Sequence, residues 1–126
     1  MSGSIKHGTD RDEYLCSEGC YILELSNSPD DDAVSIARAR VPPGVTTRWH
    51  RLAGTTERYV IIAGSGCVEL GASPSRNVRP GDAVIIPPLC PQRITNTGAK
   101  DLVFLAICTP RFRREVYEDM EAELTS

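Results

Sequence analysis

Short runs in which apolar and polar residues alternate, separated by turn residues, cover most of the chain between residues 20 and 110. Side chains on a strand point alternately to the two faces of a sheet, so this period of two is typical of β-strands. Clusters of Pro, Gly, Asn and Asp interrupt the runs at short intervals. The pattern predicts roughly nine short strands, which is the signature of an all-β sandwich or small barrel.

The two ends of the chain depart from this alternation. Residues 1–13 are polar and predict a flexible lead, which precedes a single domain over residues 14–126. Near the C-terminus, Val116 and Met120 recur at helical spacing among helix-forming residues. Residues 113–123 are therefore predicted to form a helix on the surface of the domain.

Two further segments indicate what lies inside the barrel. Residues 102–108 are almost continuously apolar, which predicts a buried central strand. In residues 33–41, small side chains alternate with Arg38 and Arg40. The small face is predicted to line the interior, with the two arginines on the outside.

The stretch from residue 44 to 64 predicts a hairpin with a polar turn at residues 53–56. His50 precedes the turn and Glu57 follows it, so the hairpin can set an imidazole beside a carboxylate on one side of a sheet. The other histidine, His7, lies in the polar lead. The hairpin therefore carries the predicted functional site.

Residues two positions apart on a strand share a face, so neighbours of His50 and Glu57 at that spacing are predicted to line one pocket. Trp49 points to the opposite face and is predicted to serve in packing or at an interface. Apolar walls with a few convergent polar groups are the usual form of a small-molecule site. The predicted lining residues are Arg48, Leu52, Tyr59, Ile61, Cys90 and Ile94.

Composition and charge limit the partners. The formal net charge of -3 and a pI near 5.4 give no reason to expect nucleic acid or an anionic membrane. No stretch approaches the roughly 18 apolar residues that span a bilayer, and the polar N-terminus lacks an apolar signal core. We therefore expect a cytoplasmic protein whose partner is a small molecule.

The five cysteines are an odd number and are predicted to be free thiols, because a reducing compartment argues against a disulfide framework. Cys16 and Cys20 are spaced C-x3-C, but the absence of a second pair argues against a zinc knuckle. Cys90 and Cys108 would replace a missing metal ligand if they point inward.

Two segments resemble the motifs of the cupin superfamily, with the spacing of both motifs intact. The first motif, G-x5-H-x-H-x3/4-E-x6-G, matches at Gly44, His50, Glu57 and Gly64 and departs at Leu52. The second motif, G-x5-P-x-G-x2-H-x3-N, matches at Gly81, Pro87 and Asn96 and departs at Leu89 and Gln92. The chain thus resembles a small single-domain cupin over roughly residues 20–110.

This resemblance implies a double-stranded β-helix, the jelly-roll barrel of cupins, with a metal held by two His, one Glu and a final His. His50 and Glu57 fall on ligand positions. Leu52 falls on the position of the second His and cannot coordinate, whereas Gln92 replaces the last His and offers only an amide oxygen. A divalent metal ion of unknown identity would therefore be held weakly, by His50, Glu57 and Gln92 with waters.

Two interpretations of these polar residues stay open. In one, a divalent metal occupies the site. In the other, the site is degenerate: Arg48 pairs with Glu57, and His50 and Gln92 only satisfy hydrogen bonds.

The sequence thus predicts a cupin that binds a small organic molecule in its barrel. Catalysis would be of the lyase, isomerase or oxygenase kind, assisted by a metal or by Glu57 as the catalytic base. The alternative is a non-catalytic binding or sensing module whose metal site has decayed. The resemblance also implies a homodimer, which would bury an apolar face of the first strand formed by Tyr21, Leu23 and Leu25.

Overall fold

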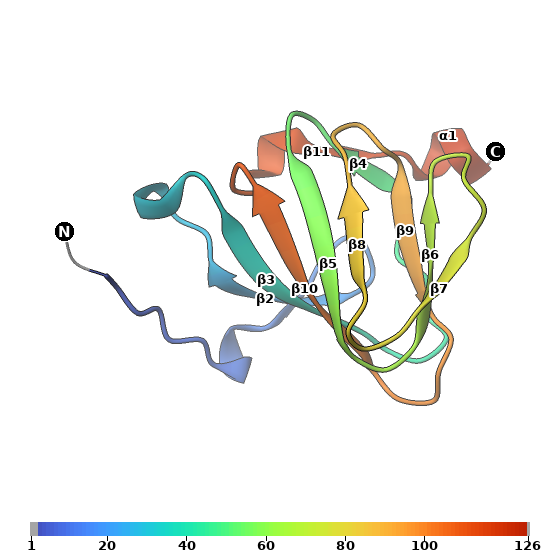
Figure 1. The fold of residues 1–126 in the computed structure, drawn as a ribbon, viewed down its shortest axis with the longest axis horizontal. Helices are drawn as coiled ribbons and strands as arrows, with labels where there is room; N and C mark the ends of the chain where they lie inside the picture. The colour runs from blue at the N-terminus through green and yellow to red at the C-terminus, as the bar shows by residue number, and fades with distance from the viewer. Residues whose placement is uncertain (1–2, 126) are drawn as a thin grey trace.

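Two antiparallel β-sheets face each other across a hydrophobic core (Figure 1). The computed structural model describes residues 3–125. The six strands of the larger sheet are, in order, β1 (Tyr14–Leu15), β2 (Tyr21–Ser26), β3 (Ser35–Val41), β10 (Leu102–Thr109), β5 (Thr56–Ala63) and β8 (Ala83–Ile86). The five strands of the smaller sheet are β11 (Tyr117–Asp119), β4 (His50–Leu52), β9 (Gln92–Asn96), β6 (Gly66–Leu70) and β7 (Arg76–Val78). This arrangement confirms the prediction of an all-β jelly-roll barrel.

Helical segments are short and lie at the periphery. The α-helix α1 spans Glu121–Thr125, and three 3-10 turns span η1 (Asp10–Asp12), η2 (Pro29–Asp31) and η3 (Arg114–Val116). Within residues 3–125, the structure contains no helix that is long and apolar enough to cross a membrane.

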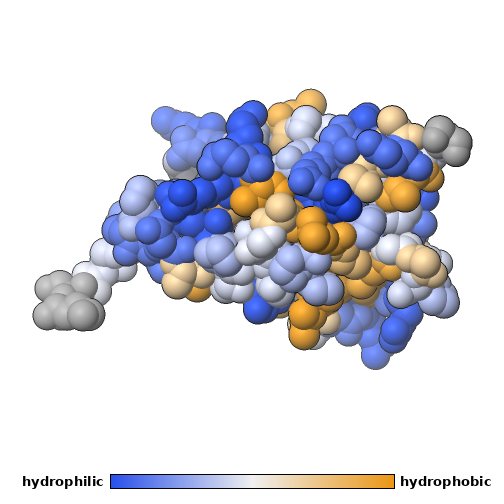
Figure 2. Space-filling view, turned by 90° about the horizontal axis from the view of Figure 1, so that it is seen from above, coloured by the Kyte–Doolittle hydropathy of each residue, from blue (hydrophilic) through white to orange (hydrophobic). Residues whose placement is uncertain are grey.

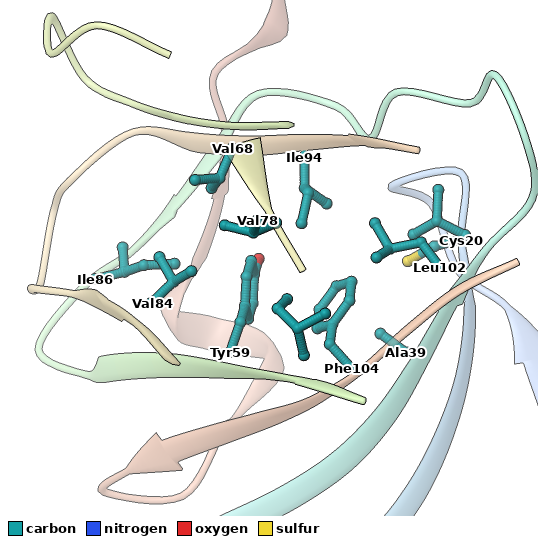
Figure 3. Packing of buried hydrophobic residues seen from close by; sticks show 12 residues of the cluster. Cys20, Ala39, Tyr59, Val68, Val78, Val84, Ile86, Ile94, Leu102 and Phe104 are labelled. Atoms are coloured by element: carbon teal, nitrogen blue, oxygen red, sulfur yellow. The ribbon is translucent and has the colours of Figure 1, made fainter. Parts of the chain in front are cut away.

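Strand β10 lies at the centre of the larger sheet, between β3 and β5, as predicted for residues 102–108. Its residue Phe104 is buried, and the ring centroids of Phe104 and Tyr59 are 4.4 Å apart. Figure 3 shows these rings below Val68 and Ile94 of the opposite sheet. Burying an apolar side chain of this size contributes about 1.5–3 kcal/mol. The core therefore fixes the strands that carry the polar site.

Gly64 ends strand β5 at a close approach between two main chains. Its φ of +84° lies in the region that favours glycine, and a Cβ at this position would lie 2.6 Å from the carbonyl oxygen of Asp101. A side chain would displace the backbone here, which explains the last glycine of the first motif.

The C-terminal segment differs from the predicted helix over residues 113–123. The α-helix begins only at Glu121, and strand β11 precedes it and pairs with β4, with Tyr117 opposite Leu52. Without β11, strand β4 would present an open edge. Main-chain hydrogen bonds to that edge outweigh a weak local preference for helix. The predicted helix bounds are therefore wrong.

Ion pairs fasten the lead to the outer faces of β2 and β3. Glu13 lies 2.6 Å from the guanidinium of Arg40, and Asp10 lies 2.8 Å from that of Arg38. These contacts place Arg38 and Arg40 outside the barrel, as predicted. The hydrogen bond from Arg40 lowers the pKa of the Glu13 carboxyl.

The lead also covers part of the apolar face of β2. Leu23 is only 3% exposed in the single chain, and a Cβ on Gly8 would lie 3.2 Å from Leu25. The homodimer stays a prediction, and other apolar side chains are available to it. Figure 2 shows hydrophobic residues exposed among hydrophilic ones in the middle of one face. The exposed large apolar residues are Ile5, Tyr14, Leu15, Ile62, Ile85, Leu89 and Leu124.

Candidate functional site

A cavity of about 330 Å³ lies along the inner face of β2, β3 and β10. Small side chains make the space, because Ser35 and Ala37 of β3 and Ala106 of β10 line its floor. The loop between β1 and β2 forms one wall, and residues 112–117 contribute to the rim. The small face of β3 therefore lines the interior, as predicted.

Glu57 is the acidic residue that the central hairpin contributes to this cavity. It lies on β5, is only 9% exposed, and its Oε1 atom has no hydrogen-bond partner in the described structure. Burial raises the pKa of the Glu57 carboxyl to about 7, against the opposing influence of nearby His50. The negative charge of Glu18 raises this pKa further.

His50 lies on β4 and is held by contacts on several sides. Its Nδ1 atom lies 2.8 Å from the carbonyl oxygen of Arg48, and its ring stacks on Tyr117 with centroids 5.3 Å apart. Because a carbonyl oxygen only accepts hydrogen bonds, Nδ1 carries a proton, and in the neutral form of the ring the lone pair is therefore on Nε2. That Nε2 atom lies 3.6 Å from a carboxylate oxygen of Glu18.

Gln92 lies next to His50, because the two residues are paired across β4 and β9. The hydroxyl of Tyr59 donates a hydrogen bond to the amide oxygen of Gln92. Gln92 also acts as a hydrogen-bond donor toward Glu57, which lowers the pKa of that carboxyl. His50, Glu57 and Gln92 are thus brought together as predicted, but the amide oxygen of Gln92 is already engaged.

The apolar residues of the predicted pocket lie in the core instead of on the cavity. Alternation along the strands does place them inward, but the barrel interior at that level is filled by side chains (Figure 3). The cavity opens beside this cluster, where the residues of β3 and β10 are small. Of the predicted lining residues, Tyr59, Ile61 and Ile94 belong to the core, Leu52 is buried, and Cys90 packs against the core from outside.

Arg48 does not line the site, and its predicted pairing with Glu57 is wrong. The Arg48 side chain is 45% exposed and lies 3.0 Å from Asp119 of β11. Strand β4 begins only at His50, so strand alternation does not extend back to Arg48. Trp49 is buried beneath the guanidinium of Arg93, which confirms its predicted packing role.

The loop between β1 and β2 brings in residues that the sequence analysis did not assign to the site. The thiol sulfurs of Cys16 and Cys20 are 3.3 Å apart, and a Glu18 oxygen lies within 4.8 Å of both. Gly19, with a φ of +97°, closes the turn by donating its N–H to the carbonyl of Cys16. The N–H of Arg48 binds the carbonyl of Glu18, which anchors the loop beside β4.

The environment of the loop perturbs its ionisable groups. A hydrogen bond from the Cys20 thiol lowers the pKa of Cys16 to about 6, and the same contact raises the pKa of Cys20. Burial raises the pKa of Glu18 to about 8, and the charge of Cys16 adds to this rise. The only sequence signal for this cluster is the pattern C-x-E-x-C at residues 16–20. The contact between Glu18 and His50 joins residues that are more than 30 positions apart in the chain.

The residues present do not fit the four-ligand metal site that the cupin motifs imply. Leu52 is a buried hydrocarbon, and the oxygen of Gln92 already accepts the Tyr59 hydroxyl. Only His50 and Glu57 remain from that set. These two residues are too few to form the family's metal centre at those four positions.

Comparison with known proteins gives the family. The sequence profile of the cupin domain matches residues 37–108. The chain belongs to the cupin family. This cupin is also 33% identical over 110 residues to the uncharacterized protein MJ1618 of Methanocaldococcus jannaschii, covering 86% of this chain and 87% of that protein.

Solved structures with the same fold include enzymes. The nucleoside dehydratase Pac13 of Streptomyces superposes with a TM-score of 0.76 at 13% identity, covering 94% of this cupin and 92% of Pac13. KdgF of a Halomonas species has a TM-score of 0.76 at 18% identity, covering 90% and 98% of the two chains. At these identities the likeness shows the double-stranded β-helix fold alone.

Proposed function

We propose that this cupin binds a small polar organic molecule in the cavity and moves a proton on it through Glu57. The observation that carries the proposal is that Glu57 lines the cavity and that its buried Oε1 atom has no hydrogen-bond partner in the described structure. A buried polar atom without a partner is costly, and a ligand that supplies one offsets that cost. The reaction class is that of a lyase or an isomerase.

The shape and lining of the cavity support this proposal. A volume of about 330 Å³ matches the lower end of known small-molecule sites. The cavity is lined by the apolar side chains of Leu15, Ile22 and Phe112 together with the carboxyl groups of Glu18 and Glu57. Arg114 also lines the cavity and would bind an anionic group of the ligand. A variant of the related-fold protein Pac13 is solved with uridine, so barrels of this shape accept small polar molecules.

The arrangement around Glu57 suits a general base. His50 is fixed by Arg48 and Tyr117, and Gln92 is fixed by Tyr59, so the groups next to Glu57 are already oriented. Preorganised neighbours reduce the rearrangement needed when a proton is transferred. In this proposal Glu57 takes a proton from a C–H or O–H group of the ligand.

Proton transfer can be tested by hydrogen–deuterium exchange on ligands in D2O. A panel of nucleosides, hydroxy acids and sugar acids is first screened for binders by saturation-transfer NMR. We expect a binder whose C–H signal is lost by exchange in the presence of the wild-type protein. In Glu57→Gln, exchange should fall by about a hundredfold or more while the ligand still binds.

Two controls separate this result from indirect effects. Glu69→Gln alters a carboxylate that lies outside the cavity and forms an ion pair with Arg93 at 2.8 Å. This variant should promote hydrogen–deuterium exchange on the ligand as the wild type does. Ala106→Leu narrows the cavity floor and should weaken binding. Binding without any exchange would contradict the proposal and favour the non-catalytic module. Exchange that is unchanged in Glu57→Gln would contradict the role of Glu57.

A further inference from the structure

The loop between β1 and β2 gathers metal-binding atoms that the cupin motifs do not include. We propose that this loop holds a zinc ion, with Cys16, Glu18 and Cys20 as ligands and the Nε2 atom of His50 as the fourth. The proposal is independent of the proton-transfer role of Glu57, because none of its ligands is Glu57.

The spacing of the three donor atoms of the loop suits a tetrahedral ion. The Nε2 atom of His50 lies near Glu18 but is not among the donors that all lie within 4.8 Å of one another, so it must move closer to complete the shell. Zinc binds thiolate sulfur at about 2.3 Å, which places two sulfurs about 3.8 Å apart in a tetrahedron. The sulfurs of Cys16 and Cys20 are 3.3 Å apart as free thiols, so they need to separate by only about half an ångström. The Glu18 oxygen already lies within 4.8 Å of both sulfurs. Two thiolates, one carboxylate and one imidazole are a donor set that zinc accepts.

His50 is prepared to act as a ligand. Its Nδ1–H donates to the carbonyl oxygen of Arg48 at 2.8 Å, which leaves the lone pair on Nε2. Metal-binding histidines usually donate the other ring N–H in this way, since the bond fixes both the tautomer and the ring orientation. The Nε2 atom points toward Glu18, at 3.6 Å from its nearer oxygen.

The carboxyl groups near the loop have few cationic partners. In the described part of the chain, the Glu18 carboxyl forms an ion-pair contact only with His50, and the Glu57 carboxyl forms none, although both residues line the cavity. Burial disfavours the ionised form of both carboxyls and raises their pKa values, because a buried anionic group without a cation is unfavourable. A divalent ion at the loop offsets this cost, and Glu57, which is nine-tenths buried and whose Oε1 atom has no partner in the described structure, lines the same cavity.

The loop is also held in place before any metal binds. The turn is closed by the hydrogen bond from the Gly19 N–H to the Cys16 carbonyl at 3.1 Å. The Glu18 carbonyl accepts the N–H of Arg48 at 3.0 Å, which ties the loop to the chain two residues before His50. Binding therefore requires little ordering of the main chain, which favours affinity.

The test is a metal titration of the full-length, untagged and reduced protein after treatment with a chelator. Cobalt(II) is the spectroscopic probe, and zinc is then added to displace it. We expect one equivalent of cobalt to give thiolate-to-cobalt charge-transfer absorption, which zinc abolishes. Cys16→Ser and Cys20→Ser should each weaken this absorption, because one of the two thiolates is lost, and should weaken zinc binding by at least about tenfold, or about 1.4 kcal/mol.

Matched variants locate the site. Cys67→Ser and Cys90→Ser change cysteines outside the loop and should bind zinc like wild type. Glu18→Gln and His50→Gln should keep the thiolate absorption but weaken zinc binding. The proposal would be overturned if Glu57→Gln lost metal binding while Cys16→Ser and Cys20→Ser kept it in full. The ion would then lie at the family's usual position.

A second measurement uses the wild-type protein and so does not depend on the folding of variants. Zinc should protect Cys16 from alkylation, as read by peptide mass spectrometry, while half-buried Cys67 and Cys90 react at an unchanged rate. Cys20 is only 1% exposed and is not used as a reporter. Equal alkylation of Cys16 with and without zinc would overturn the proposal.

Discussion

Single side chains inside this barrel are fixed by a few specific contacts. Gln92 is only 1% exposed, and its amide oxygen depends on the hydroxyl of Tyr59. In the cupin motif this position carries a metal-binding imidazole, whereas here it carries a neutral amide. The residue-level change therefore converts a metal-ligand position into a hydrogen-bonding position that orients the neighbours of Glu57.

Tyr59→Phe tests the importance of this buried hydrogen bond. Removing the hydroxyl leaves the amide oxygen of Gln92 without its donor, so the free energy of unfolding should fall by about 1–3 kcal/mol. Urea unfolding followed by fluorescence measures this difference. Tyr21→Phe is the control, since the Tyr21 ring lies on the outer face under the guanidinium of Arg40. Equal losses in both variants would show that the Tyr59 hydroxyl has no special role.

At the scale of elements, the polar lead is held by charge, and this makes its attachment sensitive to pH. Glu13 is the central group, because it contacts both Arg38 and Arg40 on β3. The hydrogen bond and charge of Arg40 lower the pKa of Glu13 in the folded state. A depressed carboxyl pKa stabilises the fold above the pKa of the unfolded state, and this stabilisation is lost as the pH falls through the folded pKa.

Glu13→Gln should therefore destabilise the protein more near neutral pH than in acid. We expect a loss of roughly 0.5–1 kcal/mol at pH 7, because pairs of partly exposed charges contribute little. The difference between the variant and wild type should shrink as the pH falls from 7 to 3, because Glu13 loses its charge as the pH falls through its lowered folded-state pKa. Urea titrations at both pH values measure this, with the exposed Glu115→Gln as control. A loss that is as large at pH 3 as at pH 7 would contradict the electrostatic explanation.

The elements that were predicted from sequence are those whose pattern is local. Strand β10 and the hairpin that carries His50 and Glu57 follow from alternation and turn residues within a few positions. The C-terminal strand β11 was missed because its conformation depends on pairing with β4, which is more than 60 residues away in sequence. The contact between Glu18 and His50 was missed for the same reason, since no local pattern specifies which loop lies over β4.

At the scale of the whole molecule, the larger sheet ends in two short strands that are open to solvent. Strand β1 forms one edge and β8 the other. Tyr14 and Leu15 of β1 are 46% and 62% exposed, and an apolar edge strand with unpaired main-chain groups is a site for pairing with a second chain. This edge also borders the cavity, because Tyr14 and Leu15 line it.

We expect a homodimer that buries the β1 edge. Sedimentation equilibrium at tens of micromolar should give about twice the chain mass of 13.8 kDa. Leu15→Glu should shift the protein toward the monomer while it stays folded by circular dichroism. Ile85→Glu is the control, because Ile85 is 67% exposed on the opposite edge. A monomeric wild type, or equal dissociation in both variants, would contradict this assembly.

The position of Tyr117 has a consequence for how the protein matures during synthesis. Tyr117 stacks on His50, and residues 112–117 contribute to the rim of the cavity, whereas β3, β5 and β10 are all complete by residue 109. Chains emerge from the ribosome N-terminus first, so the central strands are available to pair before the site is finished. A nascent chain that stops near residue 110 therefore has its core strands but an open cavity, and the His50 imidazole gains its stacking partner Tyr117 only when the last residues have been released.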